Sequence, residues 1–95
     1  MYANLSGANL QGVNFSHIWA GNAIFVGANF QNADLSYSWL GGANLSNANL
    51  TGANLQDAYA ASSIMHGANL AGAHVMDFET PISDMSCHGS PICQQ

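Results

Sequence analysis

The sequence repeats itself every five residues over most of its length. Starting at Ala3, fifteen five-residue units run without insertion to Asp77. The third position of the unit is Leu in eight units and Phe in three, the first position is Ala in eleven, and the second is Asn in eight. An amphipathic helix needs a period of 3.6 residues and a half-buried strand needs a period of 2, so a period of five fits neither. The chain is therefore restricted to an architecture in which every unit has the same structural role.

A square coil accounts for this period. Each unit forms one side and its corner, four units complete one coil, and the large third residue and the small first residue point inward. Successive coils would stack through backbone hydrogen bonds at roughly 4.8 Å. In such a coil, residues twenty positions apart lie in one column. The exceptions to the motif follow this rule, because Trp19, Trp39 and Tyr59 occupy the second position at intervals of twenty, with Glu79 next in line.

The repeated units resemble the pentapeptide-repeat family, whose motif is A(D/N)LXX, over residues 3–77. The resemblance implies an all-β fold, a right-handed quadrilateral β-helix of about four coils. Residues 1–77 are accordingly predicted to form the β-helix. Residues 78–95 leave the period and contain Pro81 and Pro91, which disfavour the interior of helices and strands. We therefore expect an irregular C-terminal cap or arm over 78–95.

The charge composition excludes several classes of function. The chain has five acidic residues and no Lys or Arg, which gives a formal net charge of −5. Without basic residues there is no means of neutralising phosphates, so direct nucleic-acid binding and attraction to anionic membranes are not expected. No apolar run approaches the roughly 20 residues of a spanning helix, so membrane insertion is not expected. The given chain also lacks a signal peptide, which predicts the cytoplasm if the chain is complete.

The aromatic column is the first candidate interaction surface. At roughly 4.8 Å per coil, rings in one column fall near the favourable range of ring separations. Trp19, Trp39 and Tyr59 can therefore form a stacked ladder that only stabilises its side of the coil. They can also form a contact surface for another protein or another copy, or a platform on which sugars or bases stack.

A second candidate surface is acidic. Asp34, Asp57 and Asp77 all fall on one side of the predicted coil, together with His17 and His74. The simple interpretation is a solvated face, and the alternative is a functional negative patch.

The tail contains both cysteines of the chain. Cys87 and Cys93 are separated by five residues. They can form a disulfide, which would indicate an oxidising compartment such as the extracellular space, or remain two reduced thiols. A metal site that adds His88 matches no familiar zinc spacing, so no metal is assigned.

No catalytic chemistry can be assigned to these residues. The four His are scattered along the chain, and no Ser-His-Asp or paired-carboxylate arrangement follows from their spacing. We therefore expect a protein that is not an enzyme and that uses no cofactor.

The ends of an open β-helix suggest a function. Unpaired backbone groups at a sheet edge recruit other chains unless they are covered, and solenoids normally carry caps for that reason. The leading hypothesis is a non-enzymatic structural protein, a homo-oligomer or polymer that stacks end to end into a filament.

Two alternatives remain. The family resemblance implies a DNA-mimicking inhibitor or protector of type II topoisomerase (gyrase), although such mimicry needs dense negative potential along a long rod. Only three acids lie on the repeats of this chain. The other alternative is a protein-binding scaffold that holds a heterologous protein partner on its aromatic side.

Overall fold

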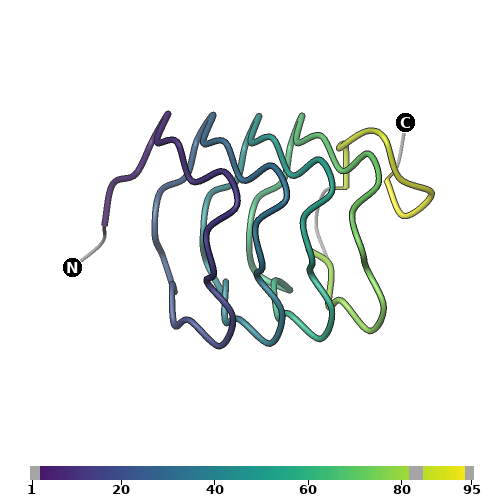
Figure 1. Ribbon diagram of the computed structural model, residues 1–95, viewed down its shortest axis with the longest axis horizontal. Helices are drawn as coiled ribbons and strands as arrows, with labels where there is room; N and C mark the ends of the chain where they lie inside the picture. The colour runs from purple at the N-terminus through teal and green to yellow at the C-terminus, as the bar shows by residue number, and fades with distance from the viewer. Residues whose placement is uncertain (1–2, 82–84, 94–95) are drawn as a thin grey trace.

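The second residue of each unit sets the register of the fold. In the computed structural model, which describes residues 3–81 and 85–93, this residue forms a parallel bridge with the residue twenty positions on. Asn9, Asn29, Asn49 and Asn69 make one such column. The bridges are isolated, so within the described residues no helix or longer strand has bounds to give. The chain winds as a right-handed quadrilateral β-helix, as the repeat predicts (Figure 1).

Four sides make up each coil of about twenty residues. The first side begins with residues 3–7, the second with 8–12, the third with 13–17 and the fourth with 18–22, and each recurs twenty residues later.

Three backbone hydrogen bonds join most sides to the same side of the next coil, with an exception at Gly42, whose N–H donates to the Ser62 Oγ at 3.0 Å. On the first side, the N–H groups of Leu5 and Gly7 donate to the carbonyls of Ile24 and Val26, at 2.7 and 2.8 Å. In the opposite direction, the Ile24 N–H donates to the Ala3 carbonyl at 2.9 Å. Each side therefore presents two N–H donors and one carbonyl to the following coil. To the preceding coil it presents one N–H donor and two carbonyls.

The preference for Asn at the second position comes from the corner that follows it. The Asn9 Oδ1 accepts the N–H of Gln11 at 3.2 Å, which is the hydrogen bond of an Asx turn. Where the fourth residue is Ser or Thr, its hydroxyl adds a second bond. The Asn44 Oδ1, for example, accepts both the N–H and the Oγ of Ser46, at 3.0 and 2.6 Å. The Asn-x-Ser/Thr pattern is thus a way of closing corners.

The fifth position explains the Gly, Asn and Asp content. Fourteen of the fifteen fifth positions have a positive φ, between 54° and 74°. This left-handed region suits Gly, and Asn and Asp tolerate it better than other residues. The first residue of the next unit then closes the corner, as when the Ala8 N–H donates to the Leu5 carbonyl at 3.0 Å.

The core is the column of inward residues inside the coil. The large third-position side chains of the later coils are fully buried and alternate with buried Ala at the first positions. Those side chains are Phe25, Phe30, Leu35, Leu40, Leu45, Leu50, Leu55, Met65 and Leu70. In the first coil, Leu5, Leu10 and Phe15 are only partly buried, because no described coil lies on their N-terminal side. Burial therefore decreases toward that end of the rod.

The coil continues past the predicted boundary at residue 77. Phe78 takes the first position of a further side and is buried, and Glu79 bridges Tyr59 in register. The regular pattern is described as far as Thr80. The period therefore covers three more residues than we predicted, since Phe78 and Glu79 fit the inward and outward positions despite their unusual identity.

The tail adds a further partial coil over the first and second sides. Gly67 N–H donates to the Ser86 carbonyl at 2.9 Å, and Leu70 N–H donates to the His88 carbonyl at 2.8 Å. Met85 is buried against the core. The described part of the tail thus lies over the first and second sides at the C-terminal end (Figure 1). Residues 82–84 and 94–95 of the predicted tail lie outside the described residues.

Candidate functional site

The three predicted aromatic residues come together as a ladder. The ring centroids of Trp19 and Trp39 lie 4.8 Å apart with planes 3° from parallel, and those of Trp39 and Tyr59 lie 4.2 Å apart at 13°. Trp19 is 74% exposed and Trp39 is 37% exposed. The indoles lie against small residues, since a Cβ added to Gly41 would come within 2.9 Å of the Trp39 Nε1. The described coils leave the outer face of Trp19, at the N-terminal end of the ladder, uncovered.

The predicted acidic side divides into two columns. Asp34 lies in the second-position column, between Asn14 and Asn54, whereas Asp57 and Asp77 lie at fifth-position corners with positive φ. Sequence reasoning placed the three acids on one side without distinguishing these positions. They therefore do not form one compact carboxylate cluster.

Hydrogen bonding stabilises the charged form of Asp34. Its Oδ1 accepts the hydroxyl and the N–H of Ser36, at 2.7 and 3.0 Å. These two hydrogen bonds, with a smaller contribution from His17, hold the pKa of Asp34 below its usual value. The Asp34 carboxylate therefore replaces the Asn amide found at the same corner in other coils.

The cysteines of the tail are bonded to each other in the structure. The sulfurs of Cys87 and Cys93 form a disulfide across a Cα–Cα distance of 5.1 Å. Within residues 3–81 and 85–93, no group of three or more His, Cys, Asp or Glu side chains is arranged to hold a metal ion. The same residues contain no helix with the length and apolar character needed to cross a membrane.

Among the described residues, the N-terminal end of the rod is an open edge. The N–H groups of Asn4, Asn9, Asn14 and Trp19 donate to no described backbone carbonyl. A hollow of about 450 Å³ opens at this end between apolar side chains that include Leu5, Phe15 and Trp19. The sequence contains no separate signal for this surface, which consists of backbone groups and of core residues without a neighbouring coil.

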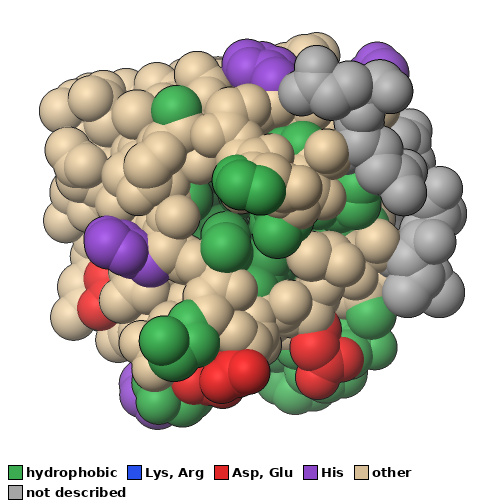
Figure 2. All heavy atoms as spheres, turned by 90° about the vertical axis from the view of Figure 1, so that its right-hand side faces the viewer, with side chains coloured by type: hydrophobic (Ala, Val, Ile, Leu, Met, Phe, Trp, Pro, Cys, Tyr) green, Lys and Arg blue, Asp and Glu red, His purple; other side chains and the backbone are tan. Residues whose placement is uncertain are grey.

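The third side forms an open edge at the C-terminal end. The Val75 and Asp77 N–H groups donate to no described acceptor, and the Ala73 carbonyl accepts no hydrogen bond from a described donor. Figure 2, which faces this end, shows apolar side chains grouped toward the centre and acidic side chains along the lower margin. Met76 is 67% exposed here. The described part of the tail therefore leaves the third side of the last coil uncovered.

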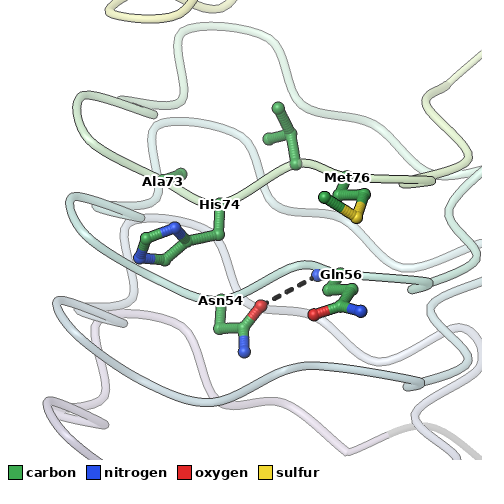
Figure 3. A pocket seen from close by; sticks show the side chains of 6 residues that line it. Asn54, Gln56, Ala73, His74 and Met76 are labelled. Atoms are coloured by element: carbon green, nitrogen blue, oxygen red, sulfur yellow. Dashed lines mark hydrogen bonds between the residues drawn. The ribbon is translucent and has the colours of Figure 1, made fainter.

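A second hollow lies beside this edge. It measures about 500 Å³ and is lined by Asn54, Gln56, Ala73, His74, Val75 and Met76. Figure 3 shows His74 and Met76 in the coil beyond Asn54 and Gln56, whose N–H···Oδ1 bond of 3.0 Å closes the corner. His74 and Asp77, which the sequence placed on one side of the coil, thus belong to an exposed edge.

The two ends differ in charge. Residues 3–33 contain no Asp, Glu, Lys or Arg, whereas the described acids all lie at position 34 or beyond. Asp77 and Glu79 are exposed in the last coil. One end of the rod is therefore neutral and the other is acidic.

Comparison with known families assigns the class of protein. The family described as pentapeptide repeats matches in eight copies, over residues 1–36, 28–67 and 40–75. The chain belongs to the pentapeptide-repeat family. A comparison with curated proteins gave no match.

Solved structures give more specific similarities. A pentapeptide repeat protein from the Arabidopsis thaliana thylakoid lumen is 26% identical, with a TM-score of 0.81 over 98% of this chain and 66% of its own. QnrB1, a plasmid-mediated fluoroquinolone resistance protein, is 25% identical, with a TM-score of 0.69 over 75% of this chain and 38% of its own. The chain therefore spans just under two thirds of the first structure and well under half of the second.

Proposed function

We propose that this chain is a non-enzymatic structural protein that self-associates end to end and extends into a filament. The observation that carries the proposal is the complementarity of the two open edges. The third side of the last coil presents the Val75 and Asp77 N–H groups and the Ala73 carbonyl. The first coil presents the opposite set on each side, one N–H and two carbonyls. Each edge thus offers the partners that the other lacks.

The apolar surface at the ends supports the same proposal. Leu5 and Phe15 at one end and Val75 at the other are inward-facing residues that remain only partly buried. Stacking would remove their exposed area from water, which stabilises by roughly 25 cal/mol for each Å² of apolar surface. Open sheet edges also recruit further strands when nothing covers them.

The charge distribution favours contact between unlike ends. If two acidic ends met, Asp77 and Glu79 would face their own copies with no Lys or Arg in either chain to offset them. Contact between the neutral first coil and the acidic end avoids this repulsion. The arrangement that follows is head to tail, which does not close on itself after two copies and continues to grow.

Electron microscopy with a matched pair of variants tests the proposal. Asn4→Pro removes the N–H of the first open edge, whereas Asn4→Ala removes the same side chain and keeps the N–H. We expect the parent protein and Asn4→Ala to form filaments in negative stain and to scatter light increasingly with concentration. Asn4→Pro should remain small. A parent protein that stays monomeric at every concentration, or equal growth of both variants, would contradict the proposal.

A second candidate is a DNA-mimicking inhibitor or protector of gyrase. Its support is the similarity to QnrB1 over 75% of the chain. It ranks second because residues 3–33 contain no acid, which leaves the beginning of the rod without the negative potential that mimicry requires. A gyrase supercoiling assay with and without a quinolone would decide it, since a protein that neither inhibits nor protects the enzyme is not such a mimic.

A further inference from the structure

We propose that successive copies in the assembly are related by half a revolution about the coil axis, so that the first side of one copy pairs with the third side of the preceding copy. This inference rests on the proposed end-to-end association and specifies its partner surface. The occupant of the open third side is a second copy of this chain, and its contact residues are those of its first side, 3–7.

The path of the tail determines this register. The described residues of the tail cover the first and second sides at the C-terminal end through the Ser86 and His88 bonds, and they leave the third side open. The C-terminal end of the rod is therefore a step: the second side extends about one coil spacing further along the axis than the third side. The described N-terminal end begins with residues 3–7 of the first side, and it forms the complementary step of the same spiral. The two steps fit when residues 3–7 of the incoming copy continue the spiral where the tail stops, over residues 73–77.

The hydrogen bonds of this contact repeat those inside the coil. The Asn4 N–H of the incoming copy would donate to the Ala73 carbonyl, as the Ile24 N–H does to Ala3. The Val75 and Asp77 N–H groups would donate to the carbonyls of Asn4 and Ser6 in the incoming copy. All three donors and acceptors of the open third side are then satisfied without a new type of interaction.

Side chains at the contact also continue their columns. Leu5 of the incoming copy would lie over Val75, closing two inward residues that are only partly buried. On the adjacent second side of the preceding copy, the open face of Trp19 would lie over His88 of the tail, which is exposed. The molecule already contains such a pair, because His17 stacks on Tyr37 with ring centroids 5.1 Å apart and planes 4° from parallel.

Stacking without rotation would conflict with the cap. In that register the incoming residues 3–7 would lie over 63–67, where the Gly67 N–H already donates to Ser86. The incoming second side would compete with His88 for Ala68 and Leu70. The unrotated contact therefore requires displacement of the disulfide-closed tail, whereas the half-revolution leaves the tail in place.

Cysteine cross-linking distinguishes the two registers. In adjacent coils, second-position residues lie at roughly 4.8 Å, a distance that a disulfide can span. Asn4→Cys mixed with His74→Cys reports the half-revolution, and Asn14→Cys mixed with His74→Cys reports the unrotated register. The parent protein is the control for exchange with the Cys87–Cys93 disulfide, and peptide mapping verifies that bond in each sample. Light scattering on every mixture records whether the protein has assembled.

We expect mild oxidation to give cross-linked dimer from the Asn4→Cys and His74→Cys mixture only. Dimer from the Asn14→Cys mixture, or assembly without cross-linking in either mixture, would overturn the half-revolution and leave end-to-end association standing. Mixtures that remain monomeric by scattering, like a monomeric parent protein, would overturn both proposals together.

Discussion

Replacing Ser38 by Ala should stabilise the protein. Ser38 occupies a first position, where eleven units carry Ala, and it is 2% exposed. Its Oγ is buried and has no hydrogen-bond partner among the described residues. A buried hydroxyl left without a partner costs about 1–3 kcal/mol, and the small void left by one missing oxygen offsets part of that gain. We therefore expect Ser38→Ala to raise the free energy of unfolding by about 1 kcal/mol, or the melting temperature by about 4–8 °C for a domain of this size.

Ser63 provides the matched control. It is also 2% exposed at a first position, but its Oγ donates to the Ala60 carbonyl at 2.8 Å. Ser63→Ala should therefore lower the free energy of unfolding by about 1 kcal/mol, the net value of one such bond. Thermal unfolding of dilute protein followed by far-ultraviolet circular dichroism measures both variants. If Ser38→Ala were destabilised as much as Ser63→Ala, the destabilising effect assigned to the unpaired Ser38 hydroxyl would be refuted.

Three further perturbations test the corners, the charge and the cap. Gly41→Ala should lower the free energy of unfolding by about 1–3 kcal/mol, because the added Cβ would lie 2.9 Å from the Trp39 indole, which is held between two rings. In the control Gly21→Ala the nearest atoms are 3.5 Å from the added Cβ, so this variant should lose less stability. Equal shifts in melting temperature for the two variants would contradict this prediction. Because the folded-state pKa of Asp34 lies below 3.8, its carboxylate stabilises the fold above that pH and this contribution disappears as the pH falls through the lowered pKa. Asp34→Asn should therefore lose less stability on acidification than the parent protein, and parallel acid-unfolding curves would contradict the assignment. Reducing the Cys87–Cys93 disulfide should cost about 2 kcal/mol by releasing a short loop, which melting with and without reductant measures; unchanged midpoints would mean that the loop does not hold the cap.

The repeating part of the fold was predictable because four five-residue units of the sequence correspond to the four sides of one coil. A column of Asn9, Asn29, Asn49 and Asn69 follows from a twenty-residue coil, and the structure pairs these residues by parallel bridges. The stack of Trp19, Trp39 and Tyr59 follows from the same twenty-residue spacing. Positive φ at the fifth position requires Gly, Asn or Asp at most corners, so composition and geometry agree.

The cap was not predictable, because its register departs from the period. Met85 and Ser86 still lie twenty residues after Met65 and His66, but His88 pairs with Asn69, only nineteen residues earlier. Pro81 and Pro91 led to the prediction of an irregular segment over 78–95. Residues 86 and 88 of this segment nevertheless form backbone hydrogen bonds with the last coil. The open edge at 73–77 depends on which sides the tail covers, and that is a long-range property.

The measurement that tests the central claim most directly is electron microscopy of the purified protein at high concentration. The rod is 32 × 25 × 22 Å. Our account predicts narrow, unbranched filaments as wide as a single coil, in which each copy adds about four and a half coils, or about 22 Å of length at roughly 4.8 Å per coil. Single particles of the size of one rod at every concentration would contradict end-to-end association.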